Sequence, residues 1–243
     1  MSRLPVFDDW PHFADDEIAA AAAVLRSGRV NYWTGDEGRL FEQEYAEATG
    51  RRYGVAVANG TLALELALRA FGIGAGDDVV TAARTYVASA SCAVMCGARP
   101  IVADVDRDSQ TVTAATLRAA VTPRTRALVV VHLAGWPCPM DEIMALAAER
   151  GLVVIEDCAQ AHGATYRGRP VGSFGHAGAF SFCQDKIITT GGEGGMLVLD
   201  DEAAFKRAWA FKDIGRDYDA VYHHRHPPGF RWLTGSFGSN WRL

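Results

Sequence analysis

The sequence lacks several features that would each have indicated a particular class of protein. It has no hydrophobic run long enough to span a bilayer, since the alanine run at residues 19–23 is far too short. Asp8 and Asp9 interrupt the N-terminus before an apolar leader segment can develop. The 24 Lys and Arg residues against 29 Asp and Glu residues give a net charge of −5, and no basic stripe could follow a phosphate backbone. These absences predict a cytoplasmic protein that binds neither membranes nor nucleic acid.

Two kinds of cofactor site are also absent from the pattern. The five cysteines form no C-x-x-C pair and have mostly apolar neighbours, which is typical of reduced, buried thiols rather than a disulfide framework. No G-x-G-x-x-G follows the first predicted strand, so a nicotinamide-binding protein is rejected. His223, His224 and His226 lack a carboxylate or cysteine at ligand spacing, so a solvated loop is favoured over a metal site.

Short apolar runs rich in Val and Ile alternate with helical patterns along the central part of the 243-residue chain. Helices are predicted at Thr61–Phe71, Thr85–Cys96 and Met140–Arg150, each followed by a glycine suited to a left-handed helix stop. This alternation predicts one three-layer α/β domain with a mostly parallel, seven-stranded sheet. The predicted strands are Val55–Ala58, Val79–Ala82, Ile101–Val105, Leu128–Val131, Leu152–Ile155, Ala179–Phe182 and Met196–Leu199.

The segments on either side of this block differ from it in pattern. Residues 1–50 contain two helical patterns, Asp15–Ser27 and Asp36–Thr49, and are predicted to form an N-terminal arm. Residues 51–214 form the predicted large domain. Residues 215–243 are rich in Gly, His, Arg and Pro without a sustained period, which indicates a long functional loop or a disordered one. No capping element follows that loop, so we expect the chain to be cut short there.

Lys186 is the most informative residue of the chain. It follows an apolar strand and precedes the glycine-rich run at residues 190–195, and an earlier strand ends in Glu156 and Asp157. An amine and a carboxylate at strand ends, with glycines that let a ligand approach the backbone, are what pyridoxal phosphate requires. Lys186 is predicted to lie in a partly buried, electropositive setting, where an amine loses its proton more readily. Without this context, a solvated surface lysine would be the default interpretation.

A phosphate site is predicted where the first strand meets the first helix of the block. Asn59, Gly60 and Thr61 combine free N–H groups of a first helical turn, a glycine without a side chain, and a hydroxyl. Taken alone, an ordinary Asn cap is the more common meaning of this pattern. The nearby motifs are what favour a phosphate.

Three further residues have a functional and a structural interpretation. Tyr86 follows a strand and could stack on a flat cofactor, although aromatic residues more often belong to a core. Ser181 could donate to a phosphate or simply end a strand, and Gln160 could reach the same ring or complete a turn. Asp157 itself could cap the following segment. His162 and His176 are predicted to be hydrogen-bonded structural residues rather than general bases.

Taken together, these motifs resemble the DegT/StrS-type sugar aminotransferases, which are fold type I enzymes that depend on pyridoxal phosphate. The resemblance implies that Lys186 forms a Schiff base with the cofactor, that Asp157 pairs with its ring nitrogen, and that Gln160 contacts its ring hydroxyl side. It also implies stacking by Tyr86 and phosphate binding by the remaining residues. The segments that carry it are Asn59–Thr61, Thr85–Ser89, Gly97–Asp106, Val131–Gly135, Glu156–Ala164, Ser181–Lys186 and Asn240–Arg242; the phosphate ligands it implies are Gly60, Thr61 and Ser181.

The same resemblance implies a C-terminal small domain, which we expect to be missing here, together with an activity and an assembly. Family members take an amino group from L-glutamate, sometimes glutamine, hold it as pyridoxamine phosphate and pass it to keto groups on nucleotide-linked sugars. Asn240 matches an asparagine that reaches the cofactor of a neighbouring subunit, so a homodimer with shared active sites is implied. Two alternatives stay open: a sugar dehydratase of the same family, which would carry histidine in place of Lys186, and a non-catalytic cofactor-binding or regulatory module.

Overall fold

The seven predicted strands form one sheet in the computed structural model, which describes residues 9–227 and 233–243. Their order in the sheet is β1-β9-β8-β5-β4-β2-β3. β9 runs antiparallel to both of its neighbours, and the remaining pairings are parallel. The predicted mostly parallel sheet is therefore confirmed. The strands are β1 (Tyr53–Val57), β2 (Asp78–Ala82), β3 (Arg99–Ala103), β4 (Thr125–Val131), β5 (Val153–Asp157), β8 (Ala177–Ser181) and β9 (Gly195–Leu199).

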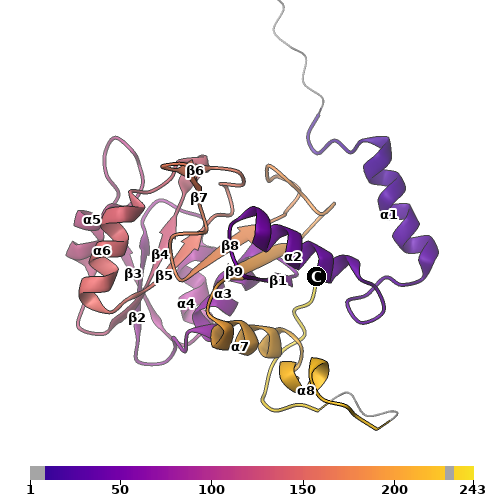
Figure 1. Cartoon of the computed structure of the whole chain (residues 1–243). Helices are drawn as coiled ribbons and strands as arrows, with labels where there is room; N and C mark the ends of the chain where they lie inside the picture. The colour runs from indigo at the N-terminus through magenta and orange to yellow at the C-terminus, as the bar shows by residue number, and fades with distance from the viewer. Residues whose placement is uncertain (1–8, 228–232) are drawn as a thin grey trace, which may run out of the picture.

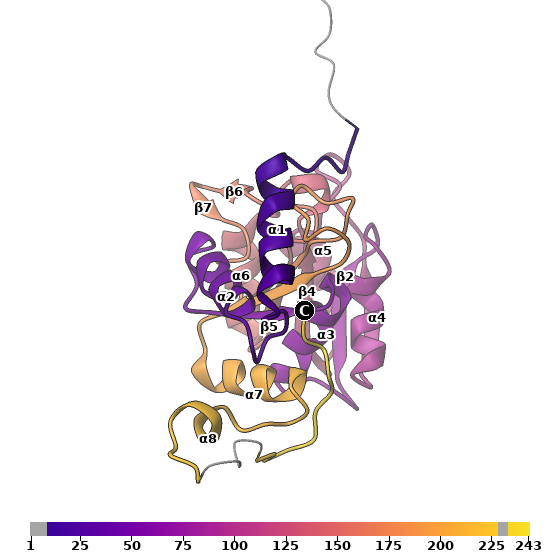
Figure 2. The ribbon, with the colours of Figure 1, turned by 90° about the vertical axis from the view of Figure 1, so that its right-hand side faces the viewer.

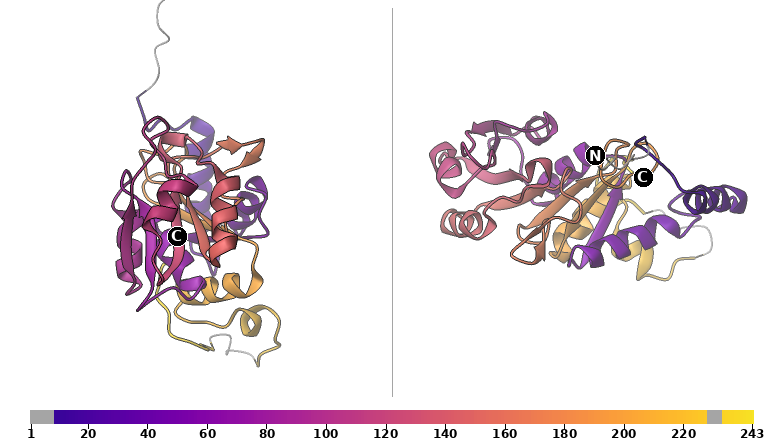
Figure 3. Two further views of the ribbon diagram at one scale, coloured as in Figure 1. Left: turned by 90° about the vertical axis from the view of Figure 1, so that its left-hand side faces the viewer. Right: turned by 90° about the horizontal axis from the view of Figure 1, so that it is seen from above.

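Helices cover both faces of the sheet and complete a three-layer domain (Figures 1 and 3). On one face pack α3 (Gly60–Ala70), α4 (Ala88–Met95) and α7 (Glu202–Lys212). On the other pack α2 (Glu37–Ala48), α5 (Ala114–Ala120) and α6 (Met140–Arg150). This arrangement matches the predicted architecture of the central domain.

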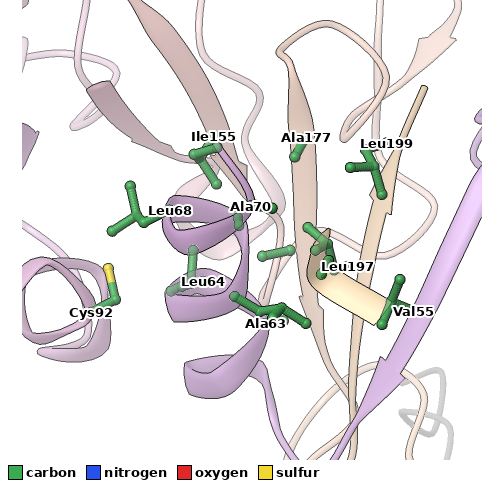
Figure 4. Packing of buried hydrophobic residues seen from close by; sticks show 14 of the residues in the cluster. Val55, Ala63, Leu64, Leu68, Ala70, Cys92, Ile155, Ala177, Leu197 and Leu199 are labelled. Carbon is green, nitrogen blue, oxygen red and sulfur yellow. The ribbon is translucent and has the colours of Figure 1, made fainter. Parts of the chain in front are cut away.

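Alternation of side chains along the strands supplies both faces with apolar groups. In β4, Ala127 and Val129 pack into the core beneath α3, whereas Leu128 and Val130 pack into the core beneath α5 and α6. Figure 4 shows Leu64 of α3 lying between α4 and the strands that carry Val55, Leu197 and Leu199. A strand buried on both faces reads as a continuous apolar run, which is why these strands were visible in the sequence.

The helix boundaries agree with the sequence most closely where a glycine ends the helix. α6 spans Met140–Arg150 as predicted, and Gly151 follows it with a φ of 63°. α4 begins at Ala88 rather than at the predicted Thr85, because the chain turns at residues 83–87 before the first helical hydrogen bonds form.

The structure also contains elements that the sequence did not reveal. They include α7 and a short hairpin of β6 (Thr165–Tyr166) and β7 (Arg169–Pro170). The expectation of an irregular segment at residues 215–243 is corrected by α8 (Tyr218–Tyr222), which Asp217 caps by accepting a hydrogen bond from the Ala220 N–H. Part of that predicted loop, residues 228–232, lies outside the described residues.

The N-terminal helix α1 (Asp15–Ser27) stands apart from the three layers in Figure 1, and in the view of Figure 2 it lies in front of them. It has no buried residue, although Ile18 and Leu25 expose apolar side chains on its surface. It begins and ends where the sequence predicted. In the described part of the chain, no helix is both long enough and apolar enough to cross a membrane.

A buried ion pair joins α7 to α2. Lys212 is fully buried, and its Nζ lies 2.5 Å from Glu42 Oε1. Glu42 also accepts hydrogen bonds from the Tyr32 hydroxyl and the Ala56 N–H, each at 2.9 Å. Because the carboxylate is committed to this interior position, its charge depends on Lys212 for neutralisation.

Replacing Lys212 by methionine should therefore leave Glu42 as an uncompensated buried charge and lower the free energy of unfolding by about 3–5 kcal/mol. Urea unfolding followed by circular dichroism measures this. The matched control is Lys206→Met, which removes a part-exposed lysine from the same helix and its pairs with Glu202 and Asp219. That change should cost less than about 1 kcal/mol. Equal losses in the two variants would contradict the assignment.

Candidate active site

A cavity of about 420 Å³ opens at the edge of the sheet where the parallel strands end. Carboxyl ends of parallel strands meet at one edge, which is where open α/β sheets place their ligands. The cavity walls come from the segments that follow β1, β2, β5 and β8. Seven of the eight residues predicted for the site line it: Gly60, Thr61, Tyr86, Asp157, Gln160, Ser181 and Lys186.

Lys186 lies on the loop that leaves β8, with its side chain 20 % exposed. Its Nζ donates to Asp185 Oδ1 at 2.8 Å, and this hydrogen bond lowers the pKa of Asp185. The side chains of the described lining do not provide the expected electropositive setting, because they include one lysine and the carboxylates of Asp157, Asp185 and Glu193. Asp185 accepts the hydrogen bond from the amine.

Asp157 ends β5 in a nearly buried position. Ser89 donates to its Oδ2 at 2.6 Å, and the Ala159 N–H donates to its Oδ1 at 3.2 Å. Burial raises the pKa of Asp157, while the hydrogen bond from Ser89 opposes that rise. In the described chain no helix directly follows Asp157, so the alternative prediction of a helix cap is wrong; its carboxylate instead closes a local turn with the Ala159 N–H and lines the cavity.

The N-terminus of α3 forms a second wall of the cavity. Asn59 caps the helix by accepting from the Leu62 N–H at 3.0 Å, so the predicted Asn cap is confirmed. Gly60 and Thr61 follow in the first turn, where N–H groups have no partner within a helix and attract an anion. A Cβ at Gly60 would lie 2.6 Å from Ser181 Cβ, so only glycine lets the helix start this close to the end of β8.

Ser181 is held by a pair of aromatic side chains behind it. His162 Nε2 lies 2.7 Å from the Ser181 carbonyl oxygen, and His162 Nδ1 lies 2.6 Å from the Tyr45 hydroxyl. Since a carbonyl only accepts, Nε2 carries the proton and Nδ1 accepts from Tyr45. Burial lowers the pKa of His162 and favours this neutral form. His162 is thus a hydrogen-bonded structural residue, as predicted.

Tyr86 and Gln160 occupy the remaining walls. Tyr86 is 69 % exposed, so its ring is available to a ligand rather than packed into the core. Gln160 Oε1 accepts from the Ala134 N–H at 2.8 Å, which ties it to the turn after β4. Asn240 does not line this cavity; it is exposed and forms an isolated bridge with Asp213.

Two groups of histidines bear on a metal interpretation. His224 Nδ1 lies 3.0 Å from the Asp219 carbonyl oxygen, so this loop histidine bonds to the backbone of α8. His132, Glu156 and Cys158 are buried within ligand distance of one another. His132 Nδ1 accepts from the Cys138 N–H at 3.1 Å, which leaves Nε2 protonated and donating to Glu156 at 3.0 Å. A proton thus occupies the position that a metal would need.

Comparison with known proteins identifies the family of this chain. Residues 11–243 match the model of the DegT/DnrJ/EryC1/StrS aminotransferase family. The chain belongs to this family. The resemblance stated from the motifs is confirmed, and the family is one of fold type I enzymes that use pyridoxal phosphate.

Individual relatives agree in class and differ in substrate. The chain is 44 % identical over 216 residues to GDP-perosamine synthase of Caulobacter vibrioides, covering 84 % of this chain and 58 % of the relative. It is 42 % identical over 216 residues, covering 88 % of this chain and 52 % of the relative, to a Streptoalloteichus tenebrarius protein whose assigned name is L-glutamine:3-amino-2,3-dideoxy-scyllo-inosose aminotransferase. The structure of the aminotransferase from Psychrobacter cryohalolentis superposes with a TM-score of 0.96 at 55 % identity, covering 98 % of this chain and 60 % of that one. The chain therefore spans a little over half the length of these relatives.

The residues of the cavity fit pyridoxal phosphate. The lining combines an amine, a nearly buried carboxylate, a helix N-terminus with adjacent hydroxyls, and an exposed aromatic ring. Pyridoxal phosphate has an aldehyde, a ring nitrogen, a phosphate and a flat ring face, which groups of these four kinds can bind.

Sequence reasoning missed the two hydroxyls behind Asp157. Thr85 Oγ1 lies 2.6 Å from Ser89 Oγ, which in turn bonds to Asp157. Their spacing of four residues at the start of a predicted helix placed both on one face. The sequence does not show that this face contacts the end of β5, whereas the structure does.

The close approach of α3 to β8 predicts the effect of Gly60→Ala. Helix propensity favours alanine by about 1 kcal/mol, but the Cβ would force the helix start away from Ser181, so we expect a net loss of about 1–3 kcal/mol in unfolding free energy. Gly192→Ala is the control, because its Cβ would meet nothing within 4 Å, and it should change stability by less than about 0.5 kcal/mol. A Gly60→Ala variant at least as stable as the wild type would refute the tight contact.

Proposed function

We propose that this protein is a pyridoxal-phosphate-dependent aminotransferase that moves an amino group from L-glutamate, or glutamine, to the keto group of a nucleotide-linked sugar. The observation that carries the proposal is the placement of Lys186 and Asp157 in one cavity beside the N-terminus of α3. Family membership supports the reaction class, and the activities for which the relatives are named support an amino-sugar product.

Each lining residue has a role in this proposal. Lys186 binds the aldehyde carbon of the cofactor and, when its amine is free, carries a proton to and from the reacting carbon as general acid and base. Asp157 pairs with the ring nitrogen. Gly60, Thr61 and Ser181 bind the phosphate at the helix N-terminus. Tyr86 stacks on the ring face and Gln160 contacts its hydroxyl side. When bound, pyridoxal phosphate supplies a ring that accepts electrons from the carbon being deprotonated.

The proposal extends to organisation. Residues 51–214 form the cofactor-binding domain, residues 1–50 an N-terminal arm, and residues 215–243 a segment for substrate and subunit contacts. Asn240 lies outside the cavity of its own chain, which suits a residue that serves a neighbouring subunit. We therefore include a homodimer with shared active sites in the proposal.

An observation disfavours one of the two rival functions, and an experiment separates the other. A sugar dehydratase of this family would carry histidine in place of Lys186, and the cavity presents the amine. A non-catalytic binding module would bind the cofactor without exchanging an amino group, so turnover of an amino donor separates it from an enzyme.

The first experiment is an absorbance titration with pyridoxal phosphate, followed by L-glutamate. The visible band of the lysine-bound cofactor should appear and then disappear as the amino group is transferred to the cofactor. A band that persists with both glutamate and glutamine would contradict the aminotransferase and favour the binding module. Absence of any band would refute the cofactor site.

Lys186→Ala should abolish the visible band and the transfer of the amino group, because no other lysine lines the cavity. Lys206→Ala is the control, since Lys206 lies on α7 and pairs with acids of the surface. Amino transfer at a near-normal rate in Lys186→Ala would overturn the assignment.

Shared active sites predict complementation between inactive variants. The Lys186→Ala homodimer should be inactive and the Asn240→Ala homodimer weakly active. A mixed dimer would contain one site with both native residues, so activity should rise when the two variants are unfolded, mixed and refolded together. If mixing restores no activity although both variants dimerise, the sites are not shared through Asn240.

A further inference from the structure

Two hydroxyl groups support Asp157 from the side of α4. Ser89 is fully buried and donates to Asp157 Oδ2 at 2.6 Å, while Thr85 Oγ1 lies 2.6 Å from Ser89 Oγ. A hydroxyl has one proton, and an ionised carboxylate only accepts. Ser89 can therefore donate to ionised Asp157 only if Thr85 donates to Ser89, which fixes the direction of both hydrogen bonds.

The neighbouring carboxylate of Glu156 has a different set of partners from Asp157. Glu156 accepts from the backbone N–H groups of Gly172, Phe174 and Gly175 at 2.7–2.8 Å, and its Oε1 lies 3.8 Å from the guanidinium of Arg51. The negative charge of Glu156 is therefore balanced by groups of the protein itself. Lys186 adds a favourable charge near Asp157, but the groups in direct hydrogen-bond contact with Asp157 are neutral. Neutral donors stabilise an anion without cancelling its charge, which leaves that charge available to a cationic ligand.

We propose that Ser89 and Thr85 form a positioning relay that keeps Asp157 ionised and oriented for the protonated ring nitrogen of the cofactor. The inference rests on the proposed function, because it assigns the two hydroxyls to the cofactor site. Burial favours the neutral acid at this position, and a neutral Asp157 would lose its attraction for a pyridinium ring. The relay opposes that loss through the hydrogen bond from Ser89 to Asp157 Oδ2.

Ser89→Ala separates this role from simple packing when two ligands are compared. One ligand is pyridoxal phosphate and the other is its 1-deaza analogue, in which carbon replaces the ring nitrogen. Loss of a hydrogen bond to a charged group should weaken the binding of pyridoxal phosphate roughly tenfold or more. The analogue has no nitrogen for Asp157, so its dissociation constant should stay close to that of the wild type. Ser91→Ala, the same change two residues along α4, should alter neither constant.

Thr85 provides a second, less buried test of the same relay. Thr85→Val removes the hydroxyl at nearly constant shape, and Thr85→Ser retains it. Thr85→Val should weaken pyridoxal phosphate selectively, and Thr85→Ser should bind both ligands as the wild type does. This pair keeps the inference testable if Ser89→Ala fails to fold.

The outcomes distinguish this inference from the proposed function. If the wild type binds pyridoxal phosphate but Ser89→Ala and Thr85→Val weaken both ligands equally, or weaken neither, the relay is overturned and the cofactor site stands. If the wild type binds neither ligand, the cofactor site is refuted and the relay falls with it. Selective loss of the nitrogen-containing ligand establishes the relay.

Discussion

The structure depends on two consecutive carboxylates buried at the end of β5. Glu156 and Asp157 point to opposite sides of the sheet because side chains alternate along a strand. Burial raises the pKa of Glu156, but hydrogen bonds from His132 and from backbone N–H groups lower it overall. For Asp157 burial prevails and the pKa is raised. One strand end thus supplies a carboxylate whose hydrogen bonds come from the protein and a second carboxylate that lines the cavity, where the proposed cofactor would pair with it.

The hydrogen bonds that Glu156 accepts also help to position the walls of the cavity. Its backbone donors lie in the segment that leads into β8, so the buried carboxylate fixes where that strand begins. Glycines make the approach possible: a Cβ at Gly175 would lie 2.7 Å from the Val154 carbonyl oxygen, and one at Gly178 would lie 2.7 Å from Gly172 Cα. With β8 aligned beside β5, the loop after β8 brings Lys186 into the cavity that Asp157 lines. The spacing of amine and carboxylate therefore follows from the polar contacts of Glu156 on the other side of the sheet.

The sequence predicted the parts of this arrangement that depend on local patterns. Buried strands appear as apolar runs, and glycines such as Gly151 mark helix ends, so the sheet and most of its covering helices could be anticipated. α7 was missed because its mixed pattern is decided by tertiary packing rather than by periodicity. Motif order identified the residues of the cavity, but it did not reveal that Ser89 contacts Asp157. The acids of the lining were visible as residues of the sequence, but the sequence did not reveal the sum of charges that the fold gathers around one lysine.

The charges of the lining side chains determine which ligand groups the cavity suits. The lining residues of the cavity include one lysine and three acids, so an incoming phosphate meets no side-chain cation other than Lys186 there. The first turn of α3 compensates, because its N–H groups attract a phosphate without adding a charged side chain that would compete for the acids. A single cofactor phosphate suits this arrangement, whereas the diphosphate of a sugar nucleotide needs cations outside this lining. The relatives match this part of the chain and carry the names of different activities. Under the proposed function, the lining therefore suits the cofactor, and recognition of an acceptor would depend on groups beyond it.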